Sequence, residues 1–348
     1  MEQVTQLLDK WIANGLLPGA ALRVMHKGEL VLSRDVGVRH RESGLPVNIN
    51  TLFDLASLTK VTATLPAILQ LLAKKQFTLD ERLARFFPEC PEDKREITVR
   101  QLLTHTSGLP ADLTQRRRDE PPLVLPGLVF DQPLLAQPGT QVVYSDLGMI
   151  LLGLIVEKTT GMPLDRFTQT QVFQPLGMMD TGFRPAPQRR ENTAATEWCS
   201  IQNGYIVGEV HDEKAFLMGG VAGHAGLFAT ADDLVQYSRY WLYGNDEVLP
   251  CVWLETAGRC WTRQLNGSRG LGWESNWGES IISCGRLFSG DSFGHTGFTG
   301  TSLWIDPQQE VAVVFLTNAV HLGRDNEIRR LRPVLHDAVM AHIVESDK

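Results

Sequence analysis

Hydrophobic positions follow two spacings along this chain, and extended segments cluster near its two ends. A stripe at helical spacing, formed by Val4, Leu7, Leu8 and Trp11, predicts an N-terminal helix. Short apolar runs bounded by turn residues predict strands over 19–25, 29–33, 285–289, 301–305 and 311–317. A final helix is expected over 326–344.

The middle of the chain carries helical patterns. An apolar stripe follows Ser57, and capping-box sequences begin at Thr78 and Thr98. Further helices are expected over 146–161, 163–173 and 230–243. Residues 110–138 are rich in proline and charge and predict an irregular surface segment, with the three arginines 116–118 on a solvated face. Residues 184–204 follow no pattern.

Strands at both ends with helices between them predict an α+β fold. It would have one antiparallel sheet flanked by helices, together with an all-helical lobe. Residues 1–60 and 200–348 would form the sheet region and residues 61–199 the helical region. A ligand site is expected at the boundary between the two.

Composition excludes several classes of partner. The chain has 348 residues, of which 43% are hydrophobic and 21% charged, and a net charge of −7. It therefore lacks the basic surface that nucleic acid or an anionic membrane requires, and no apolar run reaches the length of a membrane span. The N-terminus predicts an amphipathic helix and no signal peptide. We expect a cytoplasmic protein as the sequence stands, or a periplasmic or secreted one if a leader was removed.

The five cysteines do not suggest a disulfide framework. Their number is odd, and no C-x-x-C motif is present that would point to a zinc site. This usage fits a reducing compartment.

One stretch places a nucleophile beside an amine. Ser57 and Lys60 are three residues apart at an expected helix start, so their side chains share one face. The unpaired N–H groups of a first helical turn also favour developing negative charge. Alone, S-x-x-K is common and is more often a helix start with a solvated lysine. In a catalytic site the lysine would act either as a base or as a cation that activates a nearby tyrosine.

Two further segments give this pair a context. Tyr144-Ser145-Asp146 precedes a helix, and His295-Thr296-Gly297 precedes the strand predicted over 301–305. In this order the three elements resemble the signature of the penicillin-recognising serine hydrolases. That family includes class C β-lactamases, D-Ala-D-Ala carboxypeptidases, D-aminopeptidases and β-lactamase-like esterases. The resemblance covers nearly the whole chain, including the stretch 102–109, and implies a β-lactamase/transpeptidase-like fold that needs no cofactor.

The resemblance assigns the chemistry position by position. Ser57 matches the acylated nucleophile, Lys60 its amine partner, and Tyr144 the phenol that moves the proton. Asp146 stands where the family usually has Asn. Because a carboxylate there favours a charged Lys60, Tyr144 is the preferred base.

The third motif and the oxyanion site follow in the same way. His295 stands where β-lactamases have Lys, as in some D-Ala carboxypeptidases and D-aminopeptidases. Thr296 and Gly297 complete the motif. The backbone N–H groups of Ser57 and of Phe298, placed on the strand after Gly297, would hold the oxyanion.

The glycine-rich segment 210–228 resembles a penicillin-binding-protein-like or esterase subgroup. No function follows from its sequence. His211, Asp212 and His224 would either line the pocket or brace a loop, and bracing is the simpler interpretation.

Two other active sites fit less well. Gly290–Gly294 matches the G-x-S-x-G elbow around Ser292, with His321 and Asp306 downstream, but no helix is expected to follow. H-E-x-x-H and paired histidines at i, i+4 are absent, so a metal hydrolase is not expected.

The predicted function is a serine hydrolase that acts through an acyl-enzyme. Its substrate would be a small ester, β-lactam or amide, with D-amino-acid peptides as the leading amides, and no nucleic acid or membrane is expected as a partner. The alternative is a receptor or sensor for penicillin or peptidoglycan that is acylated once and does not turn over.

Overall fold

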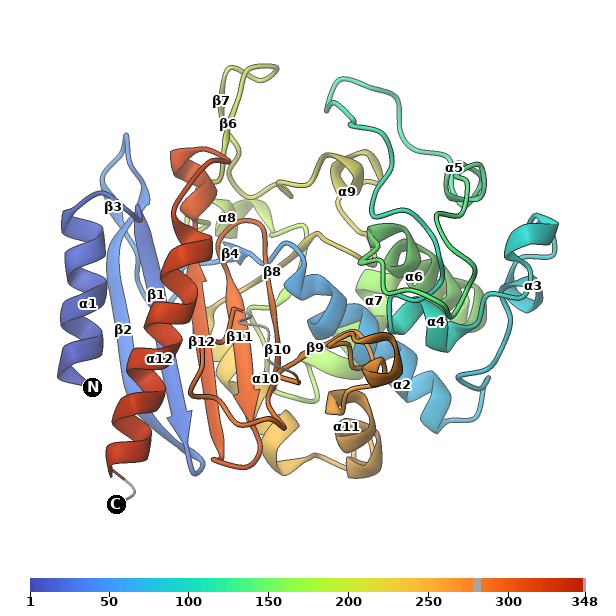
Figure 1. The fold of residues 1–348 in the computed structure, drawn as a ribbon. Helices are drawn as coiled ribbons and strands as arrows, with labels where there is room; N and C mark the ends of the chain where they lie inside the picture. The colour runs from blue at the N-terminus through green and yellow to red at the C-terminus, as the bar shows by residue number, and fades with distance from the viewer. Residues whose placement is uncertain (278–282, 347–348) are drawn as a thin grey trace.

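A seven-stranded antiparallel sheet forms the frame of the molecule (Figure 1). The computed structural model describes residues 1–277 and 283–346. The strand order is β3-β2-β1-β12-β11-β10-β9. The strands are β1 Gly19–His26, β2 Glu29–His40, β3 Leu45–Pro46, β9 Glu274–Ser275, β10 Phe293–Thr296, β11 Ser302–Asp306 and β12 Val311–Thr317. Because β1 pairs with β12, a strand from near the start of the chain and a strand from near its end lie side by side at the centre of the sheet.

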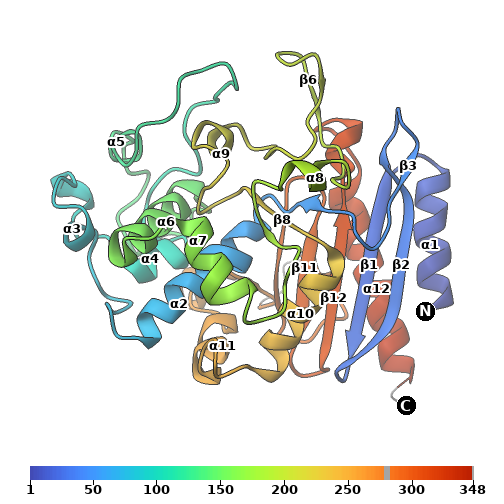
Figure 2. The same ribbon diagram turned by 180° about the vertical axis from the view of Figure 1, so that it is seen from behind.

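Both faces of the sheet are covered, so its central strands are buried on both sides. Alternate residues of a strand point to opposite faces. Val313 and Phe315 of β12 pack in one core with α1 (Glu2–Ala13) and α12 (Ile328–Ser346). Val314 and Leu316 point into the other, larger core, on the side of α10 (Ala231–Tyr243) and the central helices (Figure 2).

Of the remaining helices, α8 lies at the upper end of the sheet and the others gather beyond β9 and α10 (Figure 1). The remaining helices are α2 Leu65–Ala73, α3 Leu83–Phe86, α4 Val99–Leu103, α5 Gly127–Phe130, α6 Asp146–Thr160, α7 Leu164–Thr168, α8 Pro187–Arg190, α9 Glu213–Leu217 and α11 Cys251–Gly258. The buried helix α6 is at their centre. The Ser145 side chain caps its start, and Gly161 in the left-handed conformation ends it. Among the described helices, none is by itself both long and apolar enough to cross a bilayer; α6 together with the bent continuation 164–173 meets that test.

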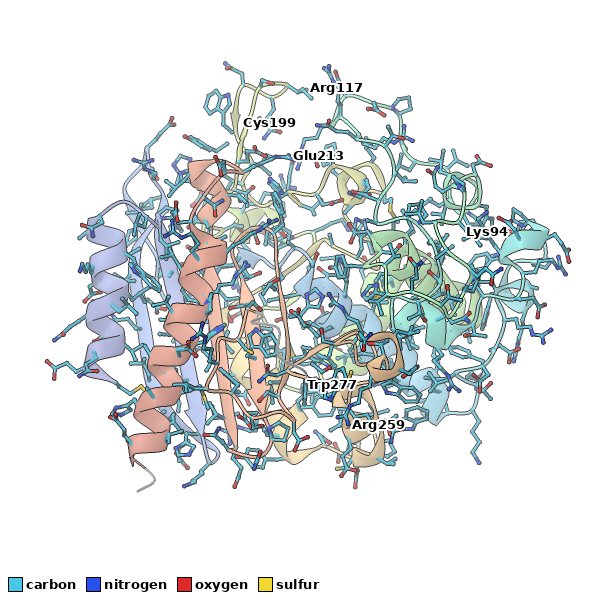
Figure 3. All side chains as sticks on the ribbon, viewed as in Figure 1. Lys94, Arg117, Cys199, Glu213, Arg259 and Trp277 are labelled. Atoms are coloured by element: carbon cyan, nitrogen blue, oxygen red, sulfur yellow. The ribbon has the colours of Figure 1, made fainter. Side chains whose placement is uncertain are left out.

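Short strands connect these parts. β4 (Phe53–Asp54) and β5 (Gly182–Phe183) both pair with β8 (Leu227–Ala229), which brings the segment before Ser57 against the end of the glycine-rich segment. β6 (Trp198–Cys199) and β7 (Gly204–Tyr205) form a hairpin that projects at the top of the molecule, opposite the loop that carries Arg117 (Figure 3).

The predicted α+β fold is confirmed, as are most of the elements, while four local predictions are wrong. No strand forms over 285–289. Thr78 does not start a helix: a turn follows it, and the next helix begins only at Leu83. β2 extends to His40. Arg118 is not solvated: its side chain is 5% exposed and lies over the Phe216 ring.

The division into a sheet region, 1–60 with 200–348, and a helical region, 61–199, stays a prediction. Part of the sheet region, 278–282 and 347–348, lies outside the described residues.

Candidate active site

Ser57 follows a strained turn at the end of β4. Ala56 has a φ of +46°, a left-handed conformation that costs a non-glycine residue energy and is common at functional sites. The buried Asp54 side chain holds this turn by accepting a hydrogen bond from the Ala56 N–H at 2.8 Å. The helix that follows is wound as a π-helix over Lys60–Thr64 and continues as α2. The structure thus places Ser57 just ahead of a helix, as predicted, with Lys60 in its first turn.

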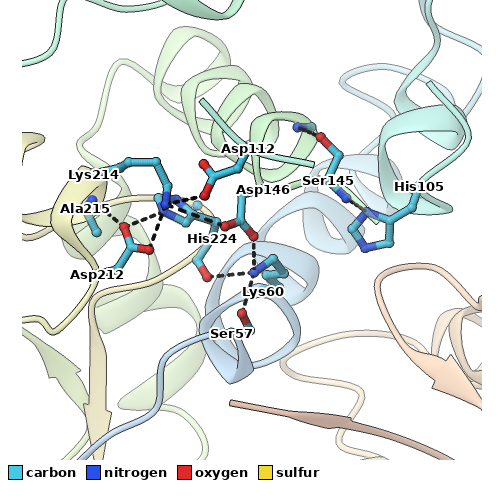
Figure 4. A network of polar contacts seen from close by, with 12 residues as sticks. Ser57, Lys60, His105, Asp112, Ser145, Asp146, Asp212, Lys214, Ala215 and His224 are labelled. Carbon is cyan, nitrogen blue, oxygen red and sulfur yellow. Dashed lines mark hydrogen bonds and ion pairs between the residues drawn. The ribbon is translucent and has the colours of Figure 1, made fainter. Parts of the chain in front are cut away.

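Lys60 is fully buried among polar groups. Its Nζ donates to Ser57 Oγ at 2.8 Å and to the His224 carbonyl oxygen at 3.1 Å, and it forms an ion pair with Asp146 Oδ1 at 2.8 Å (Figure 4). Burial alone would lower the pKa of Lys60, but Asp146 and Tyr144 together outweigh burial and the pKa is raised. Lys60 is therefore an ammonium at neutral pH.

Tyr144 lies between two imidazoles and two cations. Its ring centroid is 4.6 Å from that of His105 and 5.8 Å from that of His295. Lys60 Nζ and the Arg269 guanidinium each lie 5.1 Å from the same ring. Both cations lie within cation–π distance of the ring. The Ser145 N–H donates to His105 Nδ1 at 3.1 Å, which fixes the histidine against the tyrosine.

His295 is a neutral side chain inside β10. Its Nδ1 donates to the Thr296 carbonyl oxygen at 2.8 Å, so Nε2 carries no proton. Burial and the nearby charges of Lys60 and Arg269 hold the pKa of His295 well below its usual range. The motif His295-Thr296-Gly297, expected to precede a strand, begins within the strand β10.

The turn after β10 presents the predicted oxyanion amide. Phe298 lies in this turn and not on a strand, which corrects the prediction. Arg332 supports the turn from α12, because its guanidinium donates to the carbonyl oxygens of Gly297 at 2.5 Å and Gly300 at 3.2 Å. In the described part of the chain, neither the Ser57 nor the Phe298 N–H donates a hydrogen bond, so both remain available to a ligand.

Two cavities meet at Ser57 and Tyr144. The first has a volume of about 330 Å³ and is also lined by the stretch from His295 to Phe298 and by Arg269, Arg329 and Arg332. The second has a volume of about 270 Å³ and is lined by residues of the glycine-rich segment and by Asp112 and Asp146. Phe298 and Arg324 border both. The structure thus brings together all eight of the predicted site residues.

The glycine-rich segment both braces the site and lines it. The His211 N–H donates to Asp54 Oδ2 at 2.6 Å, which ties this segment to the turn before Ser57. His211 Nε2 pairs with Glu197 at 3.0 Å, and His224 Nε2 pairs with Asp212 Oδ1 at 3.0 Å. His211, Asp212 and His224 also border the second cavity, so these residues both brace a loop and line the pocket.

Several residues of the site were missed from the sequence: Asp54, Lys214, Arg269 and Arg332. None belongs to one of the three motifs. Lys214, Arg269 and Arg332 reach the site through tertiary contacts, whereas Asp54 precedes Ser57 by three residues and accepts from the Ala56 N–H. The sequence offered a signal for Lys214 alone, which stands two residues after Asp212 in the glycine-rich segment.

The competing nucleophile elbow does not form. Ser292 is fully buried in a turn that leads into the strand β10 and not into a helix, so Gly290–Gly294 is no nucleophile elbow. Asp146, Asp212 and His224 hold ligand atoms within 4.8 Å of one another. However, the Lys214 ammonium lies 3.0 Å from Asp212 and 4.0 Å from Asp146 and supplies the positive charge that a metal ion would bring.

The fold and the site together define an enzyme of the serine hydrolase class. The chain belongs to the β-lactamase family, whose model, described as "Beta-lactamase", matches residues 4–337. It is 32% identical over 370 residues to a protein of Escherichia coli (strain K12) named "Putative D-alanyl-D-alanine carboxypeptidase", covering 92% of this chain and 83% of that protein. A protein of the same name from Salmonella typhimurium is 31% identical, with 90% and 82% covered.

Solved structures share the fold at lower identity. EstCE1, described as a hydrolase with promiscuous acyltransferase activity, superposes with a TM-score of 0.76 at 23% identity, over 95% of this chain and 98% of its own. A class C β-lactamase gives the same TM-score at 20% identity, over 100% and 96%.

Proposed function

We propose that this protein is a peptidase that removes a carboxy-terminal D-amino acid through an acyl-enzyme on Ser57. One observation carries the proposal: Ser57 Oγ lies 2.8 Å from a buried, charged lysine and lines a cavity that is also lined by four arginines, Arg324 among them, and by the carboxylate of Glu274. Arg269, Arg329 and Arg332 suit the free carboxylate of a peptide end. The names of the relatives at 31–32% identity point to the same substrate class.

Acylation would begin with Tyr144. The two cations beside its ring stabilise the phenolate, which takes the proton of Ser57 Oγ as that oxygen attacks the substrate carbonyl. The N–H groups of Ser57 and Phe298 hold the oxyanion. Tyr144 then gives the proton to the leaving amine, and the carbon–nitrogen bond breaks.

Deacylation would reverse these proton movements. A water molecule attacks the ester on Ser57, Tyr144 takes the water's proton, and Ser57 Oγ receives it as the acyl group leaves. Lys60 stays charged throughout, because Asp146 lies 2.8 Å from its Nζ. In this reading Lys60 orients Ser57 and stabilises the phenolate, and it is not itself the base.

Two experiments test the proposal. Intact mass spectrometry with a labelled penicillin and with a small activated ester should locate one adduct on Ser57. A peptide ending in D-Ala-D-Ala should release D-Ala, whereas the same peptide with a carboxy-terminal amide should react at least about tenfold more slowly, because it lacks the charge that the arginines would bind.

Other outcomes would assign a different function. Turnover of the ester with equal rates for acid and amide peptides would favour an esterase, in line with the hydrolase EstCE1, which shares only the fold. A single stoichiometric burst without turnover would favour the receptor. Labelling elsewhere than Ser57 would refute the proposed nucleophile.

A further inference from the structure

A closed ring of polar contacts begins and ends at the Lys60 ammonium (Figure 4). From Lys60 it runs to Asp146 Oδ1 at 2.8 Å, and from Asp146 Oδ2 to the Lys214 ammonium at 4.0 Å. Lys214 then pairs with Asp212 Oδ2 at 3.0 Å, and Asp212 Oδ1 with His224 Nε2 at 3.0 Å. The His224 carbonyl oxygen closes the ring by accepting from Lys60 at 3.1 Å.

Lys214 is the second cation of this ring and is almost as buried as Lys60. Its side chain is 9% exposed. A third carboxylate, Asp112, holds it at 2.9 Å from the opposite side. Asp112, Asp146 and Asp212 come from the loop after 110, from α6 and from the residue before α9. Asp146 and Asp212 are 18% and 21% exposed, whereas Asp112 is 45% exposed, so Lys214 is the cation shared by two largely buried carboxylates and one at the surface.

The backbone around Lys214 is fixed, so its position is built into the fold. Asp212 caps α9 by accepting from the Ala215 N–H at 2.8 Å. Further along, a side chain at Gly223 would overlap the Met149 carbonyl oxygen of α6. Thr64 donates to the Gly223 carbonyl oxygen at 2.7 Å, which places the next carbonyl, that of His224, against Lys60.

We propose that Lys214 is a positioning residue for the acylation chemistry: it holds Asp146 ionised and divides that carboxylate between two lysines. This inference rests on the proposed function of Ser57, Lys60 and Tyr144. Asp146 adds a negative charge beside Lys60, and Lys214 is the matching positive charge on its other oxygen. The glycine-rich segment, whose purpose the sequence did not reveal, would serve to deliver this charge.

The proposal predicts a specific change in pH dependence. The groups that face Lys214 are Asp112, Asp146 and Asp212, and those that face Asp146 also include Lys60 and His224. Burial favours the neutral form of Asp146 and of Asp212. Lys60 and His224 oppose it at Asp146, and His224, Lys214 and the Ala215 N–H oppose it at Asp212. Without Lys214, one carboxyl would therefore keep its proton to a higher pH, and Asp146 would lose its hold on Lys60.

The test is the pH profile of kcat/KM with an activated ester for Lys214→Gln. Its acid limb should lie about one pH unit above that of the wild type. The charge-balanced double variant Asp212→Asn/Lys214→Gln should bring the limb back. Lys94→Gln is the matched control, because Lys94 is also a buried lysine paired with an aspartate but lies at the edge of the helical part (Figure 3). Its profile should not move.

Each outcome decides the question. An unmoved acid limb in Lys214→Gln, or a double variant with additive losses, would show that Lys214 only packs and would overturn the proposal. If Lys214→Gln fails to fold, Asp212→Asn alone should move the limb downward, and an upward shift or none would overturn it as well. Labelling of Ser57 in the wild type separates these results from a failure of the proposed function.

Discussion

Replacing Asp146 by Asn tests the central ion pair while nearly preserving its shape. At 2.8 Å and an effective dielectric constant of about 20, two unit charges attract each other by roughly 6 kcal/mol. Removing the Asp146 charge also removes its desolvation cost, which offsets much of that attraction. Lys60 keeps the Ser57 hydroxyl and the His224 carbonyl as partners. We therefore expect a loss of about 3 kcal/mol in the free energy of unfolding, the low end for a broken buried pair.

The pKa shifts of Asp146 and Lys60 determine how this loss of stability depends on pH. The pKa of Asp146 is lowered from 3.8, because the Lys60 and His224 charges outweigh burial, so its contribution disappears as the pH falls through the folded-state value. The pKa of Lys60 is raised from 10.5, so its contribution is full below 10.5 and is lost as the pH rises through the folded-state value. The difference between wild type and Asp146→Asn should be constant from about pH 5 to 9 and shrink on either side.

Urea unfolding at several pH values measures this difference. Asp80→Asn is the control: Asp80 lies 2.6 Å from Arg100, but both side chains are exposed, so its loss should stay below about 0.5 kcal/mol. In the same preparation, the pKa of Lys60 should fall by about one unit or more in Asp146→Asn, as followed by NMR of the lysine side chain. Equal losses for the two aspartates would refute the view that burial makes the Lys60 pair strong.

Three further substitutions test the site. Ser57→Ala should abolish turnover of an activated ester and change the free energy of unfolding by no more than about 0.5 kcal/mol, so retained turnover would contradict the proposed nucleophile. Tyr144→Phe should lower kcat by about a hundredfold or more, and a smaller effect would point to another base. Gly297→Ala should cost about 1–3 kcal/mol of stability, because its Cβ would meet Thr301 and the Leu55 carbonyl oxygen, whereas Gly290→Ala, with open space around it, should be neutral in the same urea assay.

The sequence was sufficient where a pattern is local. The apolar stripe of α1, the capping box at Thr98 and the left-handed Gly161 after α6 are decided within a few residues, and the structure has all three. The three motifs and their order were also sufficient to predict the family. Prediction failed where pairing partners are distant in the chain: β10 has only four residues, and only its neighbours β9 and β11 make it a strand.

The same limit explains which site residues were missed. Arg332 projects from a helix at the end of the chain and reaches the Gly297 carbonyl oxygen only because α12 packs on the sheet. Asp54 joins the turn before Ser57 to His211, 157 residues away in the chain, through one buried carboxylate. In the sequence each is an unremarked charge, since nothing local distinguishes a buried carboxylate from a solvated one.

The two departures from the family motif are each matched by a charge from outside the motif. His295 is neutral where β-lactamases have Lys, and the Arg269 guanidinium lies 5.1 Å from the Tyr144 ring instead. Asp146 is charged where the family usually has Asn, and Lys214 lies 4.0 Å from it on the side away from Lys60. A cation lost from one strand and an anion gained on one helix would each upset a buried site, because unpaired charge is costly there. The motif in this chain is therefore complete only together with residues that no motif contains.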